Sequence, residues 1–176
     1  TLEASDFDDM VLGLTYSHSF NRFFEIDLNA DFYDRTVVSE YNDFVDGGGF
    51  PILHDSSLEM IPVTVGVRFL PFGRAKAGQK KPVLFVGAGG GINFWRYEEV
   101  GDFIDFGDPG NPIVFGAFSE SGEAFVTYAA AGLELPVSRG FNVGFEARWF
   151  GSDDDLSGDF GGLGEIDLSG FSASVS

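Results

Sequence analysis

The sequence predicts an all-β protein, an antiparallel up-and-down transmembrane β-barrel in which eight strands are expected and about seven are present. Three observations support this prediction. Seven segments alternate between apolar and small or polar residues, which is the periodicity of a strand with two different faces. The connections between these segments alternate between short and long, and their charge changes sign with their length. No run of 18 or more apolar residues is present, so no membrane-spanning helix is predicted.

Composition sets limits on both fold and function. The 176 residues fit a single domain, 1–176, and the 25 glycines and 21 phenylalanines favour strands over helices. The absence of cysteine excludes a disulfide scaffold and a thiolate-ligated metal site. The formal net charge of −18 argues against nucleic-acid binding, because phosphates and acidic side chains repel each other.

The first three predicted strands cover residues 10–20, 24–35 and 61–69. The second shows the alternation most clearly. Its apolar positions are Phe24, Ile26, Leu28, Ala30 and Phe32, and the opposite positions are Glu25, Asp27, Asn29, Asp31, Tyr33 and Arg35. The third alternates valines with Thr64, Gly66 and Arg68. Each strand is therefore expected to place one apolar face against a small or polar one.

Four further strands are predicted near residues 84–94, 125–135, 141–149 and 166–175. The first of these opposes its apolar residues with glycines, and the third opposes its aromatic residues with Asn, Gly, Glu and Arg. In the last one the alternation changes phase near Gly170, which predicts a bulge.

The connections differ in charge at the two ends of these strands. Shorter connections at 19–22, 71–82 and 136–140 contain Lys and Arg but no acid, and define a basic end. Long connections at 40–59, 98–123 and 153–167 contain no Lys or Arg and most of the acidic residues. They define an acidic end, expected to be external, since membrane barrels have short periplasmic turns and long external loops.

The polar face decides between a membrane barrel and a soluble one. A water-exposed face should carry many long charged side chains, whereas this face carries mostly small residues. Its few charged positions are Glu25, Asp27, Asp31, Arg35, Arg68, Glu134, Glu146 and Arg148. We expect these to form a network inside a narrow lumen, because in the reverse orientation each arginine would face lipid at a cost of about 2–4 kcal/mol. The network either lines a conduction path or forms a salt-bridged plug.

One strand is expected to be absent from the chain. Bacterial barrels have even strand numbers, and the first predicted strand runs from an acidic stretch towards the basic end. We therefore expect the sequence to begin within the first external loop, after a missing outward strand, and to stop before the usual terminal aromatic residue.

Two segments resemble a known family. The sequence VRFLP at 67–71, a basic turn and KPVLFVGAGGG at 81–91 resemble the "KPYvGaGvG" hairpin of small outer-membrane β-barrel proteins, the OmpW-like and OmpA-membrane-domain-like group. Pro82-Val83 stands where Pro-Tyr is usual, and GFNVGFEARWF at 140–150 resembles the penultimate strand of that group. The resemblance implies eight antiparallel strands in a Gram-negative outer membrane and no catalytic residue.

The external connections suggest two further sites. In the long connection 98–123, Phe103, Phe106, Phe115 and Phe118 either form a partner surface or fold over the barrel mouth. The acids of 153–167 either bind Ca²⁺ or form a solvated loop, and they lack the spacing of a calcium-binding loop, so no metal is predicted. His18 and Ser19 are adjacent on a strand and point to opposite faces, which argues against a hydrolase.

The function expected from these patterns is that of a non-enzymatic, cofactor-free integral protein of the bacterial outer membrane. Its partners would be outer-membrane lipid and, through the acidic external loops, another envelope protein, but not nucleic acid. An alternative is a narrow channel for small or apolar molecules, as the OmpW resemblance implies. A soluble ligand-binding barrel is the third class.

Overall fold

The computed structural model describes residues 9–74, 81–138, 141–161 and 164–176, except for the side chains at 42, 43 and 159. Within these ranges the protein is all-β and antiparallel, with one short 3-10 helix (Gly158–Phe160). The strands are β1 (Leu12–Ser19), β2 (Phe24–Val45), β3 (Pro51–Phe69), β4 (Val83–Ile104), β5 (Ile113–Ser138), β6 (Phe141–Asp155), β7 (Glu165–Asp167) and β8 (Gly170–Val175). Their order in space follows the chain, as the sequence predicts for an up-and-down sheet.

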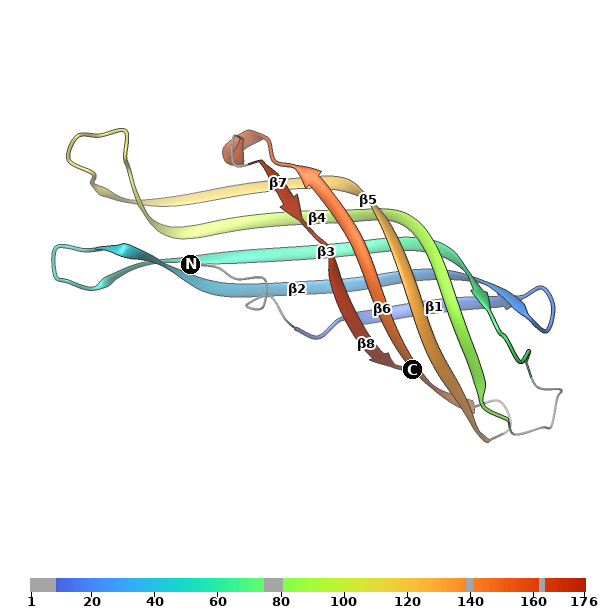
Figure 1. Cartoon of the computed structure of the whole chain (residues 1–176). Coiled ribbons are helices and arrows are strands. Elements are labelled where there is room, and N and C mark those ends of the chain that lie inside the picture. Colours follow the sequence, from blue (N-terminus) through green and yellow to red (C-terminus); the bar gives the residue numbers. More distant parts are fainter. Residues whose placement is uncertain (1–8, 75–80, 139–140, 162–163) are drawn as a thin grey trace.

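The strands fill seven positions across one curved sheet, because β7 and β8 both pair with β6. β7 and β8 form one interrupted strand, with a break at residues 168–169 that lies next to the phase change predicted at Gly170. Figure 1 shows the sheet curling so that β6 and β8 pass across β1 and β2. The prediction of about seven strands is thus met for the described residues. The further expectation, that an earlier outward strand is missing from the chain, stays a prediction, because residues 1–8 lie outside the described residues.

The predicted closure into a barrel is wrong for the described part of the chain. β1 pairs only with β2 and β8 pairs only with β6, so the sheet has two free edges. The reason lies in strand direction. With seven antiparallel positions the first and last strands run the same way, and a β1–β8 pair would be a parallel ladder in an otherwise antiparallel sheet.

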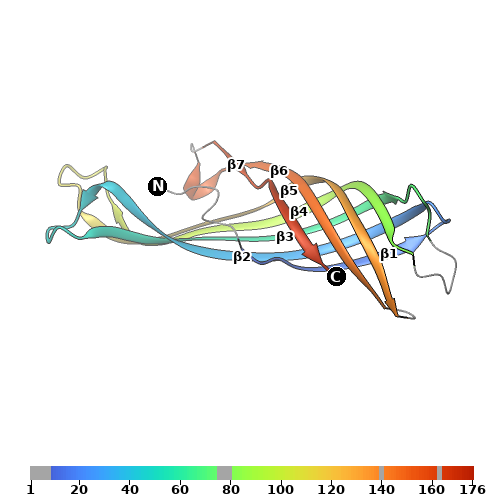
Figure 2. The ribbon, with the colours of Figure 1, turned by 60° about the horizontal axis from the view of Figure 1, so that its bottom comes forward.

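Two of the predicted long loops are mostly strand. β2, β3, β4 and β5 contain 22, 19, 22 and 26 residues, so the β2–β3 and β4–β5 hairpins extend far beyond the segments predicted as strands. Figures 1 and 2 show both hairpins projecting together from the curved part of the sheet. Their connections are short turns near Asp46 and Asp108. The third long connection also begins as strand, because β6 continues to Asp155.

The predicted alternation sets which side chains face inward and which face outward. One row of register partners crosses the sheet on its convex, outward face: His18, Ile26, Val67, Ala88, Ala129, Trp149 and Phe171. The neighbouring row on the concave face is Ser19, Glu25, Arg68, Gly87, Ala130, Arg148 and Ser172. Apolar side chains therefore point out and polar ones point in, the reverse of a soluble sheet protein.

Two clusters of buried apolar residues lie in the concavity. Near the basic end Leu70, Val83 and Phe85 pack together. Towards the acidic end Trp95, Ala124 and Leu168 form a second cluster, which we call the interior apolar cluster. Partly buried residues packed against it are Leu58, Met60, Tyr97, Leu156 and Ile166. The segment that joins β6 to β8 thus folds into the mouth of the concave face.

Candidate functional site

The concave face between these two apolar clusters carries a set of buried ion pairs, which we call the interior charge cluster. It consists of Glu25, Asp27, Asp31, Arg68, Arg74, Glu134, Glu146 and Arg148. These side chains come from β2, β3, β5 and β6 and from the β3–β4 connection. Alternation brings them to one face, and the curl of the sheet brings distant strands within reach of one another.

Arg68 lies at the centre of this cluster. Its Nε is 2.5 Å from Asp27 Oδ2 and its Nη2 donates to Glu146 Oε2 at 2.8 Å. Its guanidinium also lies 4.2 Å from the centre of the Phe85 ring. Because Arg68 is on β3 and Glu146 is on β6, this contact spans the concavity over β4 and β5.

Arg148 makes a second contact across the concavity. From β6 its Nη1 donates to Asp31 Oδ2 on β2 at 2.9 Å, and its Nη2 donates to Asn29 Oδ1 at 3.2 Å. Its Nε donates to Glu146 Oε1 at 2.9 Å, so Arg68 and Arg148 share one carboxylate. The Arg148 guanidinium lies 5.0 Å from the centre of the ring of Tyr128, which is on β5.

Arg74 belongs to the cluster although the sequence prediction left it in the basic turn. Its guanidinium contacts both Glu25 oxygens, at 2.6 and 2.8 Å, and donates to Glu134 Oε2 at 2.8 Å. Gly73, with φ of 70°, turns the connection back, and the Arg74 backbone N–H donates to Arg22 O at 2.6 Å. The sequence did contain one signal for Arg74. The predicted network held more acidic residues than arginines, so a further cation was needed to balance its charge.

Arg35, by contrast, does not join the other predicted residues. It lies beyond the curved part of β2, where its side chain is 39% exposed and pairs with Asp9 at 2.8 Å. The other seven predicted charges are brought together. Periodicity correctly assigned the face of Arg35 but could not assign its height along a strand of 22 residues.

Burial gives these contacts their energetic weight. Glu25 and Asp27 are each 1% exposed, and an unpaired charge at such a position carries a large desolvation penalty. Room for the large side chains comes from glycines on the same face. A Cβ on Gly66 would lie 2.1 Å from Tyr128 Oη, and one on Gly132 would lie 2.3 Å from the Phe85 ring. The ion pairs connect strands on opposite sides of the concavity.

The acidic end of the interior is held by fewer polar contacts. Trp95 Nε1 donates to Asp154 Oδ2 at 2.8 Å, which joins β4 to the end of β6. The Tyr97 hydroxyl donates to Glu99 at 2.6 Å, and its ring packs against Phe160 at 5.2 Å. Burial and the Glu99 carboxylate raise the pKa of Tyr97, so its hydroxyl remains a donor throughout the physiological range.

The predicted partner residues divide into two groups. Phe103, Phe106 and Phe118 belong to an aromatic strip on the projecting hairpins, whereas Phe115 is 75% exposed and makes no ring contact among the described residues. The other members of the strip are Tyr41, Phe44 and His54. Ring centres are 4.9 Å apart for His54 and Phe103 and 5.6 Å apart for Phe44 and Phe106, so the strip connects the two hairpins.

The two other candidate sites of the sequence analysis show no catalytic or metal-binding geometry in the described ranges. Ser19 donates its hydroxyl to Glu25 at 2.6 Å, while the His18 ring packs edge-on against Phe20. Asp153, Asp154 and Asp155 lie on β6, where Asp153 and Asp155 pair in register with residues of β7. Among the described residues no group of three or more His, Asp or Glu side chains is placed to hold a metal ion.

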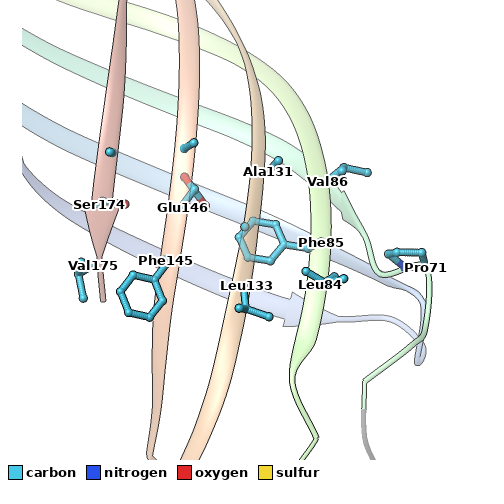
Figure 3. Close-up of a pocket in the computed structure, with 13 residues that line it drawn as sticks. Pro71, Leu84, Phe85, Val86, Ala131, Leu133, Phe145, Glu146, Ser174 and Val175 are labelled. Atoms are coloured by element: carbon cyan, nitrogen blue, oxygen red, sulfur yellow. The ribbon is translucent and has the colours of Figure 1, made fainter.

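The outward face near the basic end forms an open apolar surface. Figure 3 shows Leu84, Leu133, Phe145 and Val175 side by side on four neighbouring strands. Phe85 and Glu146 lie on the concave side of the same strands. The polar cluster and this apolar surface are thus separated only by the thickness of the sheet.

Comparison of the chain with protein-family models, with curated proteins and with solved structures finds no match. The described residues contain no helix that is long and apolar enough to cross a membrane.

Proposed function

We propose that this chain is an integral β-barrel-type protein of the bacterial outer membrane, without catalytic activity, that acts through its projecting acidic hairpins in envelope structure or partner contact. One observation carries the proposal. The outward face of the curved sheet carries a belt of mostly apolar side chains, many of them exposed, on every strand from β1 to β6 and on β8.

The belt is as tall as a membrane requires. On β3 its residues run from Ile61 to Phe69 and on β4 from Leu84 to Phe94, which are 9 and 11 residues. A tilted transmembrane strand needs about 9–11 residues. None of the outward positions within these limits is Asp, Glu, Lys or Arg. Exposed side chains such as Leu14 at 75% and Val65 at 54% would be solvated by lipid rather than water.

Charged residues limit the belt at both ends. Asp34, Glu59 and Arg96 form one register row across β2, β3 and β4 directly above it. Arg22 and Lys81 lie in the connections at the basic end. Aromatic residues near these limits, such as Phe24, packed against Phe69 at 5.2 Å, are typical of interfacial girdles.

The interior favours a structural role over conduction. Three arginines bridge five carboxylates across the concave face, and the interior apolar cluster lies above them. A permeation path would need these pairs to separate, which leaves buried charges unpaired. The projecting hairpins, with their aromatic strip and acidic residues, are the surface that we propose contacts an envelope partner.

An arginine placed in the belt tests the membrane assignment. We expect Val65→Arg to lower the free energy of unfolding in lipid bilayers by about 2–4 kcal/mol, because its charge would enter hydrocarbon. Val38→Arg is the matched control, since Val38 is 66% exposed on the outward face of β2 but lies beyond the charged row. It should change stability by less than about 0.5 kcal/mol. Equal, small effects of both changes, measured by urea titration of protein in vesicles, would contradict the proposal.

A further inference from the structure

We propose that the free edges of β1 and β8 together form a binding site for one extended polypeptide segment of a partner. This segment would run from the basic end to the acidic end, with apolar side chains facing outward and small or basic side chains facing inward. The site is independent of the proposed membrane location, because it follows from backbone pairing and interior charge.

Strand direction defines the site. β1 is antiparallel to β2, β8 is antiparallel to β6, and the intervening strands alternate, so β1 and β8 both run towards the basic end. Each has one side whose backbone N–H and C=O groups make no ladder within the described residues. One strand running in the opposite direction would pair antiparallel with both. Figures 1 and 2 show that the curl of the sheet brings the β8 edge back across β1.

The inward side chains of both edges are small. On β1 they are Gly13, Thr15, Ser17 and Ser19. Two of these point into the interior, where Thr15 donates to Asn29 at 2.9 Å and Ser19 donates to Glu25 at 2.6 Å. On β8 the inward positions are Gly170, Ser172 and Ser174. The inward side chains that the two edge strands themselves present to an added strand are therefore small, which leaves room beside them for a longer side chain.

Charge indicates which long side chain fits. The interior charge cluster has five carboxylates and three guanidiniums, a formal excess of two negative charges. Asp31 lies over Gly13 of β1 and is 20% exposed, whereas the other two carboxylates of β2, Glu25 and Asp27, are each 1% exposed. Among the described residues Asp31 forms an ion pair with Arg148, which also pairs with Glu146. An inward Lys or Arg near the acidic end of the added strand would balance this charge.

The outward side chains of β1 and β8 indicate which side chains the bound segment should place on its outward face. Leu12, Leu14 and Tyr16 on β1 are 65–75% exposed, as are Phe171 and Val175 on β8, at 71% and 70%. An occupant with apolar residues at alternate positions would continue this surface without a break. Residues 1–8 do not have this chemistry, since they contain Glu3, Asp6 and Asp8 and no Lys or Arg.

A pair of synthetic peptides tests the proposal with the full chain folded in detergent micelles. The probe has nine residues, with Val or Leu at odd positions, Ser or Gly at the second, fourth and sixth, and Lys at the eighth. Its twin carries Glu in place of Lys. We expect the Lys peptide to bind about tenfold more tightly by fluorescence anisotropy. Amide exchange should then slow in Leu12–Ser19 and Gly170–Val175 and nowhere else.

A charge variant links binding to the interior. Asp31→Asn should reduce the preference for the Lys peptide, whereas Asp34→Asn, three residues along β2 on the outward face, should leave it unchanged. Equal binding of the two peptides, or protection away from β1 and β8, would overturn the proposal. The proposal would also be overturned if the protein formed a concentration-dependent dimer in which the edge amides were protected without peptide. A second copy of the chain would then occupy the site. None of these results bears on membrane insertion, which the Val65→Arg comparison tests separately.

Discussion

Arg68 is the residue of β3 that belongs to the interior charge cluster. It pairs with Asp27 and Glu146, stacks on Phe85 and is only 11% exposed. A methionine at this position keeps the length of the side chain but leaves two buried carboxylates without this partner. The consequence of removing it is therefore dominated by the carboxylates that stay behind.

We expect Arg68→Met to lower the free energy of unfolding by about 3–5 kcal/mol. Arg96→Met is the matched control, because Arg96 pairs with Glu98 while 55% exposed, and its loss should cost less than about 1 kcal/mol. Urea titration of both variants in the same detergent gives the comparison. Similar losses for the two variants would mean that the interior pairs are solvated.

Gly66 shows how closely the interior is packed. A Cβ there would lie 2.1 Å from Tyr128 Oη and 2.7 Å from the carbonyl oxygen of Ala88. Gly66→Ala should therefore destabilise the protein by about 1–3 kcal/mol, although alanine is otherwise the better residue in a strand. Gly47→Ala, where the added Cβ meets no atom within 4 Å, should be neutral or slightly stabilising by thermal denaturation. A neutral Gly66→Ala variant would show that Tyr128 does not occupy this position.

Individual residues of the interior charge cluster show what the sequence alone can and cannot predict. Alternation assigned Glu25, Arg68 and Arg148 to the inner face, because strand periodicity is a local property. It could not find Arg74, whose contact with Glu134 depends on how a turn folds back under β5. It placed Arg35 in the network because periodicity gives the face on which a residue lies and not its position along the length of the strand.

At the scale of elements, the hairpins are the main difference between prediction and structure. The sequence predicts 40–59 and 98–123 as long connections between the alternating segments, yet most of their residues are in β2, β3, β4 and β5. Turn signals were present in the sequence. Asp46 accepts hydrogen bonds from the backbone N–H of Gly48 and Phe50, each at 2.8 Å, and Asn111 has φ of 43°. Acidity marked the solvent-exposed part of these strands rather than their ends.

The break between β7 and β8 is stabilised by Asp167. The Ser169 backbone N–H donates to Asp167 Oδ1 at 2.9 Å, and hydrogen bonding by Ser169 lowers the pKa of Asp167 below its usual range. A carboxyl whose pKa is lower in the folded state contributes stability above its unfolded pKa, and loses it as the pH falls through the folded value.

Asp167→Asn should therefore be less stable than the original protein at pH 6, and the two should converge below about pH 3. The difference should stay below about 1 kcal/mol, since this carboxylate is largely solvated. Urea midpoints measured from pH 2 to pH 6 give the curves, with Asp155→Asn as the control on the adjoining strand. A difference that persists unchanged at pH 2 would contradict this account of Asp167.

At the scale of the whole molecule, the fold is a curved sheet with reversed polarity. Its polar and charged groups are on the concave side, and its convex side is an apolar belt between a basic end and two acidic hairpins. The sequence predicted this polarity and the strand order, because both follow from periodicity and from the sorting of charge by connection. It could not predict that the edges stay open, since closure depends on a strand that must pair with both β1 and β8.

The two tryptophans offer the most direct test of the reversed polarity. Trp149 lies on the outward face of β6 and is 52% exposed, whereas Trp95 is 4% exposed in the interior apolar cluster. Trp95→Phe leaves Trp149 as the only fluorescent indole, and Trp149→Phe leaves Trp95. Both variants are reconstituted in vesicles whose lipids carry bromine on the acyl chains.

If the convex face contacts lipid, brominated chains should quench Trp149 strongly and Trp95 weakly, while aqueous acrylamide should quench neither efficiently. The account would be contradicted if acrylamide quenched Trp149 readily and brominated lipid left its fluorescence unchanged, because the belt would then face water.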